Sequence, residues 1–220
     1  MSRVNALLRT ICPGGVEYRT LAEAAHTVSG LSGKTKADFA GGHARYVSYK
    51  NVFANPGVDQ TTSDFVTLRP HESQNRLHVG DVIITGSSES VVDVGMSSVV
   101  LTEPDEPLYL NSFCFALRFN DPHMLLPDFS KHLFRSEPVR TQIRLAANGV
   151  TRINVSKVRF MEVRIPVPPI ELQRAIASTL DALSDLGAEL EVGLKEELRK
   201  RRQQYAYHRD KLLSFDEGRL

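Results

Sequence analysis

The feature that most constrains this chain is a cluster of prolines followed by a long stretch that contains none. Pro166, Pro168 and Pro169 close a segment of short apolar runs, and no proline follows them. Proline cannot donate a backbone hydrogen bond to a strand, but it costs nothing at the first position of a helix. The cluster therefore predicts that a strand ends here and that a helix begins near Pro169.

Apolar residues recur at helical spacing through this proline-free stretch. They are Leu172, Ile176, Leu180, Leu183, Leu190, Leu194, Leu198, Tyr205 and Leu212. A helix from residue 169 to 213 has about 44 residues and is about 66 Å long at about 1.5 Å per residue. This helix is too long to bury all of these apolar residues against a domain of this size. We therefore expect its C-terminal half to contact another surface. The alternative is a helix that breaks at Gly187 or Gly193 and folds back.

Residues 1–165 alternate between turn residues and short segments rich in Val, Ile, Tyr and Phe, which is typical of strands. The predicted strands are residues 45–52, 65–68, 81–85, 97–101, 110–119 and 158–165. Residues 125–147 instead predict two helices around Pro138. We expect an α+β fold in which a β-rich domain with a helical excursion, residues 1–167, precedes a long helix, 168–215, and a tail, 216–220.

Charge and hydropathy limit the classes of function. The net charge of +1 gives no overall sign of a nucleic-acid partner. Residues 131–164 are locally basic, with eight Lys or Arg against two Glu, or +6. Such a stretch suits phosphates, unless acids elsewhere in the fold neutralise it. No apolar run approaches the roughly 20 residues that span a bilayer. Because Arg9 also interrupts the one apolar run that resembles a signal peptide, we expect a cytoplasmic protein without a membrane partner.

No catalytic motif is present. The sequence lacks a Walker loop, a Gly-x-Gly-x-x-Gly after a strand and a His-Glu-x-x-His. Cys12 and Cys114 lie far apart, which predicts two thiols rather than a metal site or a disulfide. Asp81, Glu89 and Asp93 leave a nuclease as an alternative, but the Glu-x-Lys partner that such sites carry on a strand is missing. We therefore expect a chain that is not itself an enzyme and that holds no metal or cofactor.

Three polar segments are better suited to recognising nucleic acid. Amides, hydroxyls and carboxylates hydrogen-bond to base edges, while Lys and Arg hold phosphates or guanine. The candidate residues are Lys34, Lys36, Tyr46, Ser48, Tyr49, Lys50 and Asn51, then Ser87, Ser88, Glu89 and Ser90, and finally Asn148, Thr151, Arg152 and Asn154. Glu89 is a plausible acceptor for the amino group of cytosine. The alternative is that these Ser, Asn and Gly residues only form ordinary turns.

The order of these features resembles the specificity subunits of type I restriction-modification systems. In that family a target-recognition domain precedes a helical spacer that opens with a Pro-Pro-(Leu/Ile)-Glu-x-Gln motif. Pro168, Pro169, Ile170, Glu171 and Gln173 match this motif. Further landmarks are residues 12–18, residues 80–84 before a serine-rich loop, residues 151–156, and the Arg-Asp-Lys-Leu-Leu sequence at 209–213. A full subunit carries two such units in tandem, so the chain resembles a half-length form.

The resemblance implies the partners of the chain. A separate modification subunit would use S-adenosylmethionine to methylate adenine in double-stranded DNA, and a restriction subunit would cut it. A homodimer would form through an antiparallel coiled coil, with Ile176, Leu180, Leu183, Leu190, Leu194 and Leu198 in the seam. The spacer of the family also docks modification subunits, which implicates Arg199, Arg202, Tyr205 and Tyr207. Two identical domains related by a two-fold axis would recognise a palindromic bipartite site. The alternative is a truncated subunit that modulates or competes with a full-length one.

Overall fold

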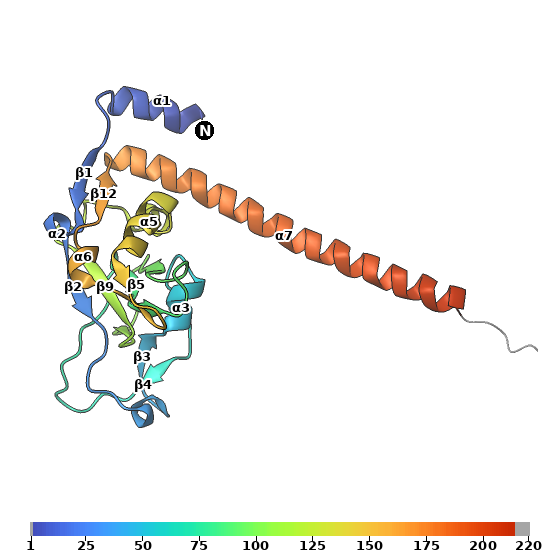
Figure 1. The fold of residues 1–220 in the computed structure, drawn as a ribbon, viewed down its shortest axis with the longest axis horizontal. Coiled ribbons are helices and arrows are strands. Elements are labelled where there is room, and N and C mark those ends of the chain that lie inside the picture. Colours follow the sequence, from blue (N-terminus) through green and yellow to red (C-terminus); the bar gives the residue numbers. More distant parts are fainter. Residues whose placement is uncertain (1, 214–220) are drawn as a thin grey trace, which may run out of the picture. The chain divides into compact units, whose positions relative to one another are not determined.

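The computed structural model describes residues 2–213. They fall into two units that divide between Ala177 and Ser178. The first unit combines strands with short helices, and the second continues one long helix (Figure 1). The α+β prediction is confirmed. The predicted tail, residues 216–220, lies outside the described residues.

A four-stranded antiparallel sheet forms the centre of the first unit. Its strands, in spatial order, are β2 (Ala25–Ser29), β9 (Cys114–Phe119), β5 (Val82–Thr85) and β7 (Ser97–Val99). All four residues of β5 are buried, and the three apolar ones alternate between two cores. Val82 and Ile84 belong to the larger core, and Ile83 belongs to the smaller core on the other face. Both faces of this sheet are therefore covered.

Two short helices cover the face of the larger core. They are α4 (Pro127–Leu133) and α5 (Glu137–Leu145), and they confirm the two helices predicted around Pro138. Pro138 lies in the first turn of α5, where its missing N–H breaks no helical hydrogen bond. Phe134 and Ile143 are fully buried in the core between these helices and the sheet.

The other elements are small and mostly lie around this centre. Three strands, β4 (Phe65–Val66), β3 (Ala44–Val47) and β8 (Tyr109–Leu110), form one sheet, and β10 (Ala147–Asn148), β11 (Ile153–Val155) and β6 (Ser87–Ser88) form another. A two-stranded pair consists of β1 (Glu17–Thr20) and β12 (Arg164–Val167). The short helices are α1 (Ser2–Ile11), α2 (Leu21–Ala24), a 3-10 turn (Lys36–Phe39), α3 (Tyr49–Ala54) and α6 (Lys157–Phe160).

Three of the predicted strands were wrong in part. Residues 45–52 leave the strand after Val47 and enter α3, because extended Ser48 occupies the position before the helix and Val52 enters the core. Residues 158–165 begin as α6, where the Ser156 hydroxyl accepts a hydrogen bond from the Arg159 N–H. Residues 110–119 are interrupted at Asn111, whose amide group binds the backbone of Val47 instead.

Proline also behaves differently from the prediction at one position. Pro166 does not end its strand but lies inside β12, opposite Tyr18 of β1. The β1–β12 pair has only two strands, so each strand has one unpaired edge. At that edge the missing N–H of a proline removes no hydrogen bond between strands. Strands β1 and β2 were not predicted, because their residues are more polar than those of the predicted strands.

The long helix is confirmed as α7 (Ile170–Leu213), a single helix of 44 residues. It continues through Gly187 and Gly193, so the alternative of a break there was wrong. Its first turns bury Leu172 and Ala177 in the first unit, whereas Leu183 and the later apolar residues are exposed. None of the described helices is long and apolar enough to cross a membrane.

Candidate nucleic-acid interface

Three of the predicted polar segments meet around one shallow hollow of about 760 Å³ in the first unit. The lining residues are Tyr49, Ser87, Ser88, Glu89, Ser90, Asp93, Phe113, Thr151 and Arg152. They come from the start of α3, from the segment that follows β5, from the loop before β9, and from the turn between β10 and β11. Residues that are distant in sequence therefore share one surface of the protein.

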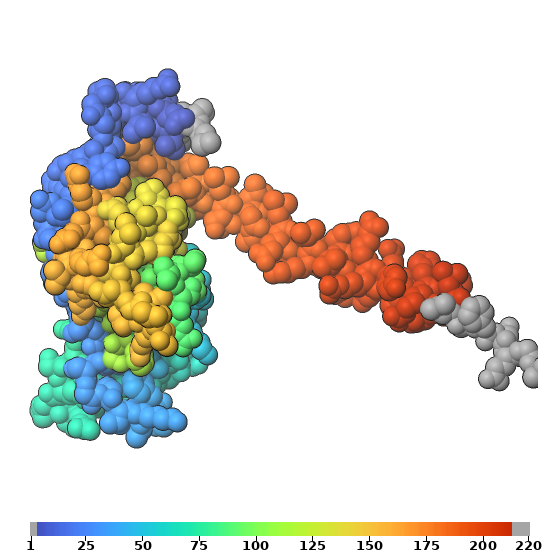
Figure 2. Space-filling model, in the orientation of Figure 1, coloured from blue at the N-terminus to red at the C-terminus, as the bar shows by residue number. Residues whose placement is uncertain are grey.

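Pairing between β6 and β11 brings two of these segments together. Ser87 and Ser88 lie opposite Asn154 and Ile153. In Figure 2 the green segment around residue 88 and the golden segment around residue 150 are neighbours on the surface, as this pairing requires. At the turn from β10 into β11, Gly149 has a φ of 123°, and a Cβ there would lie 2.2 Å from the Arg152 carbonyl oxygen. Only glycine fits this turn.

Arg152 is the cation of the hollow, and two neighbours hold its guanidinium. Its Nη2 and Nε donate to the Ser87 hydroxyl at 3.0 and 3.3 Å. Its Cζ lies 5.7 Å from the centre of the Phe113 ring, within the range of a cation–π contact. Both Arg152 and Phe113 are exposed to solvent. The guanidinium is thus oriented before any ligand binds.

Phe113 is a functional candidate that the sequence analysis missed. Its N–H donates to the Asn111 side-chain oxygen at 2.8 Å, and its carbonyl accepts from the Gly86 N–H at 2.8 Å. A Cβ at Gly86 would lie 2.8 Å from that carbonyl oxygen, so this close approach depends on glycine. The prediction placed Phe113 inside a continuous strand. Asn111 in the middle of that strand was the signal of a turn.

The remaining lining residues are mostly hydrogen-bond acceptors or hydroxyls. The Tyr49 hydroxyl donates to the Ser87 carbonyl at 3.1 Å, and the Tyr49 ring stacks on Phe53 with 6.3 Å between ring centres. Glu89 is exposed and Asp93 is partly so. One Arg against two carboxylates gives the lining a formal charge of −1. The hollow can accept hydrogen bonds from amino groups and donate them from Arg152.

Two of the predicted contact residues are instead part of the internal framework. The Lys34 ammonium is almost fully buried, where it donates to the Glu72 carboxylate at 2.6 Å and to the Thr67 carbonyl at 2.8 Å. Asn51 is buried and binds the backbone of Asp59 through both its amide oxygen and its amide nitrogen. Their polar atoms already have internal partners, so neither residue belongs to the candidate surface.

The other predicted residues lie outside the hollow. Tyr46 packs edge-on against Phe39 at 5.2 Å between ring centres, and burial raises the pKa of its phenol. Ser48 precedes α3 and is half-buried. The exposed residues are Lys36, Lys50, Asn148 and Asn154. These four side chains are accessible, but they do not line the cavity that Arg152 and Glu89 share.

The basic stretch of residues 131–164 does not form one continuous patch. Arg135 donates to the carbonyls of Ser97 at 2.8 Å and Val52 at 3.0 Å, and buried Arg140 donates to the Val92 carbonyl at 2.7 Å. Burial lowers the pKa of both guanidinium groups. These two arginines bind the backbone at the end of α3 and in the segment that contains Ser90 and Asp93 of the hollow. Their charge is therefore internal rather than presented to a ligand.

The nuclease alternative is not supported by the described residues. Both carboxylate oxygens of Asp81 bind Arg118, at 2.8 and 2.6 Å, and one of them also accepts from the His78 N–H. Asp81 is buried, so its role is structural. Within residues 2–213 no three His, Cys, Asp or Glu side chains are grouped to hold a metal ion.

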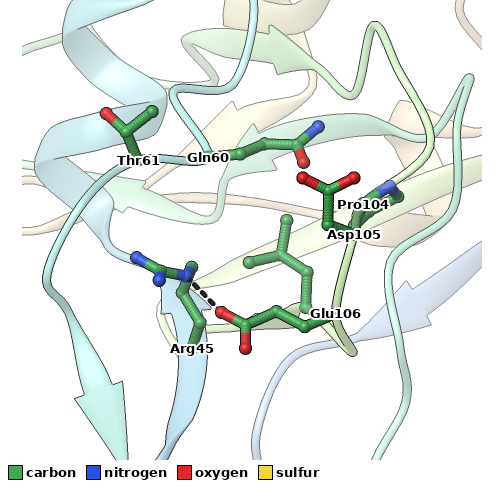
Figure 3. A pocket seen from close by; sticks show the side chains of 7 residues that line it. Arg45, Gln60, Thr61, Pro104, Asp105 and Glu106 are labelled. Atoms are coloured by element: carbon green, nitrogen blue, oxygen red, sulfur yellow. Dashed lines mark hydrogen bonds and ion pairs between the residues drawn. The ribbon is translucent and has the colours of Figure 1, made fainter.

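A second cavity, of about 350 Å³, is a weaker candidate (Figure 3). Its cation, Arg45, donates to the Glu106 carboxylate at 2.6 Å, binds the Thr62 carbonyl, and lies over the Phe65 ring. The carboxylate of Asp105 lies opposite, beside Gln60. Because its one cation is already paired, this cavity offers an anionic ligand little attraction.

The second unit presents an apolar stripe beside paired charges. Leu183, Leu190, Leu194 and Leu198 are all more than half exposed. Ion pairs one helical turn apart join Glu191 to Lys195 at 2.6 Å and Glu197 to Arg201 at 2.8 Å. Tyr205 and Tyr207 are also exposed. An exposed leucine stripe of this length marks an interaction surface.

Known proteins share this combination of domain and helix. Residues 13–200 match the type I restriction modification DNA specificity domain. The chain is 27% identical over 207 residues to the EcoR124I/EcoR124II specificity subunit of Escherichia coli, which covers 92% of this chain and 49% of that protein. A type I restriction-modification S subunit from M. genitalium superposes with a TM-score of 0.52 at 21% identity, over 92% of this chain and 47% of the other. A chain from a structure of the assembly of the type I R-M system superposes with a TM-score of 0.60 at 21% identity, over 91% of this chain and 48% of the other.

The two structural matches establish the fold, and the match over residues 13–200 establishes the family. The chain belongs to the family of type I restriction-modification specificity subunits. That family is the recognition component of such systems, distinct from the subunits that carry out the chemistry. The chain spans about half the length of its Escherichia coli relative, 49% of that protein.

Proposed function

We propose that this chain recognises a specific sequence in double-stranded DNA and directs partner subunits to it. The observation that carries the proposal is the hollow in which Arg152, Glu89 and several hydroxyls meet, in a chain of the specificity family. Arginine, carboxylate and hydroxyl groups together distinguish base pairs in the major groove. A modification subunit that holds S-adenosylmethionine would then methylate adenine, and a restriction subunit would cut unmodified DNA.

We further propose that two copies pair through antiparallel α7 helices. The exposed leucines of α7 from Leu183 onward supply the apolar seam. Burying a leucine side chain gains roughly 1.5 to 3 kcal/mol, so several of them offset the entropy lost on association. Two identical domains related by a two-fold axis bind the same half-site in inverted orientation. The target of such a dimer is a palindrome interrupted by unspecified bases.

Methylation mapping tests this function directly. The chain would be expressed with the modification subunit encoded beside it, in cells that lack other methyltransferases, and methylated adenines would be mapped across the genome. We expect one interrupted palindrome. An asymmetric bipartite motif would exclude the symmetric dimer. No methylation, together with altered methylation when a full-length specificity subunit is present, would favour a modulator instead.

The far end of α7 is the proposed docking surface for modification subunits. Arg199 and Arg202 have no ion-pair partner among the described residues, and Tyr205 and Tyr207 are exposed nearby. Exposed arginines and tyrosines are enriched at protein interfaces. Reversing the charge of Arg199 and Arg202 should reduce co-purification of the modification subunit at moderate salt. Unchanged co-purification would mean that this face of the helix is only solvated.

A further inference from the structure

We infer, on the basis of the proposed DNA recognition, that the hollow recognises one G·C base pair from the major groove. Arg152 donates to the guanine of that pair, and Glu89 accepts from the amino group of its cytosine. Both side chains line the same cavity. Neither the family nor the fold determines the identity of this base pair.

The first support is the way Arg152 is held. The Ser87 hydroxyl accepts from Nε and Nη2, and the ring of Phe113 lies under the guanidinium. Nη1 forms no hydrogen bond or ion pair within the described residues. A guanidinium has five N–H groups, so the two contacts to Ser87 leave further donors for a ligand. Guanine offers two neighbouring acceptors, N7 and O6, and arginine to guanine is the commonest specific contact in protein–DNA complexes.

The second support is the negative charge around Arg152. Glu89 and Asp93 share the hollow with it, and the lining has a formal charge of −1. A phosphate group brought into this hollow would meet two carboxylates, which repel it. An amino group on a base edge would instead find acceptors. The charge therefore favours a base edge over the DNA backbone as the ligand of Arg152.

The third support is the match between these two side chains and the base pairs. A carboxylate only accepts hydrogen bonds, and cytosine presents its N4 amino donor in the major groove. Adenine presents one acceptor and one donor, so it cannot satisfy two donors of an arginine. Thymine presents one acceptor and a methyl group. Of the four arrangements of base pairs, those with guanine and cytosine satisfy Arg152 and Glu89 together.

Ser87 is a positioning residue in this scheme. Its hydroxyl accepts two hydrogen bonds at the edge of the Arg152 guanidinium and so fixes the orientation of that group. Its own backbone carbonyl is held by the Tyr49 hydroxyl. Removing the hydroxyl should lower discrimination at the same base pair that Arg152 recognises, with overall affinity largely kept.

The test uses the full chain in complex with its modification subunit. After the methylated motif is mapped, binding is measured to duplexes in which each base pair of the half-site is replaced in turn. We expect Arg152→Ala and Glu89→Ala each to reduce discrimination at the same G·C position, by roughly 5- to 150-fold for the arginine. Ser87→Ala should act at that position with a smaller effect. Arg9→Ala, an exposed cation of α1 outside the hollow, should leave discrimination unchanged.

Three outcomes would overturn the inference. Equal weakening of all duplexes by Arg152→Ala, with a smaller salt dependence, would make Arg152 a phosphate contact. Effects of Arg152→Ala and Glu89→Ala at two different positions would show that they do not share a base pair. A half-site without a G·C pair would exclude the scheme outright.

A wild-type complex with no sequence preference would instead overturn the proposed function itself. Arg152 is exposed, so thermal unfolding of the variant should match the wild type and exclude misfolding as the cause.

Discussion

Gln173 shows how a single side chain joins α7 to the first unit. It is fully buried, and its Nε2 donates to the carbonyls of Met124 at 2.9 Å and Pro168 at 2.8 Å. Its Oε1 accepts from the Leu126 N–H at 2.8 Å. The glutamine of the Pro-Pro-Ile-Glu-x-Gln motif therefore satisfies three backbone groups that would otherwise be buried without partners.

Gln173→Ala should destabilise the protein. Leaving a buried donor or acceptor unsatisfied costs about 1–3 kcal/mol, so we expect a loss at least in this range. Chemical denaturation of the variant measures it. Gln203→Ala is the matched control, since Gln203 is exposed on the same helix and should change stability by less than about 0.5 kcal/mol. Equal stability of the two variants would mean that water replaces the lost contacts.

Glu72 gives the protein a defined sensitivity to acid. The Arg69 N–H at 2.9 Å, then Lys34 and Gln74 at 2.6 Å each, lower the pKa of this carboxyl from 4.5 to about 2. A carboxyl with a lowered pKa in the folded state contributes its full stabilisation above its unfolded pKa, and this stabilisation is lost as the pH falls. The contribution of Glu72 is therefore present above about pH 4.5 and disappears toward pH 2.

Glu72→Gln should remove this part of the acid sensitivity. At neutral pH the variant should be less stable than the wild type, and the two should converge as the pH falls from about 4.5 to about 2. Thermal unfolding at a series of pH values checks this. A difference in stability between the two proteins that stays constant across this range would show that the Glu72 carboxyl has the same pKa in the folded and unfolded states.

At the scale of elements, α7 sets the geometry of the proposed complex. It is one unbroken helix of 44 residues that contains Gly187 and Gly193 in its exposed part. Glycine in a helix interior costs roughly 0.5–1 kcal/mol relative to alanine, which does not break a helix of this length. The segment between the two glycines is therefore a suitable place to change the length of the spacer.

Inserting four residues between Gly187 and Gly193 should change the spacing of the DNA target without changing its half-sites. Four residues are close to one helical turn, about 5.4 Å, and base pairs are about 3.4 Å apart along the duplex. We expect the unspecified centre of the motif to lengthen by one or two base pairs, or activity to be lost. Methylation mapping of the variant would detect either result, and an unchanged spacer would mean that α7 does not set the distance.

At the scale of the whole molecule, the exposed stripe of α7 predicts self-association. Leu183→Asp combined with Leu194→Asp places two charges in the proposed seam and should produce monomers, because burying an unpaired carboxylate costs more than a leucine gains. Analytical ultracentrifugation measures the mass in solution. Ala188→Asp combined with Gln203→Asp adds the same charge outside the stripe and should remain dimeric. A dimer of the first variant would place the interface elsewhere.

Much of this molecule was predictable because the signals were local. Three prolines and a long proline-free apolar repeat predicted α7 nearly to its residues, since helices depend on short-range spacing. The helices around Pro138 followed from the same periodicity. Residues 87–90 and 148–154 were predicted to be polar loops, but parts of them form β6, β10 and β11. Strand boundaries were less accurate, because they depend on local turns. The Asn111 side chain binds the backbone N–H of Phe113, and the strand that contains Val47 ends at Ser48, the residue before α3.

Only the tertiary structure determined which residues come together in the hollow. Ser87 and Arg152 are 65 residues apart, and β6–β11 pairing brings them within hydrogen-bond distance. Lys34 and Asn51 carry the same side chains that a DNA contact requires, but long-range partners turn them inward. Sequence patterns report which groups a segment carries and how it folds locally. Strand pairing and burial between distant segments determine which of those groups face one another. The local spacing of residues does not encode these long-range contacts.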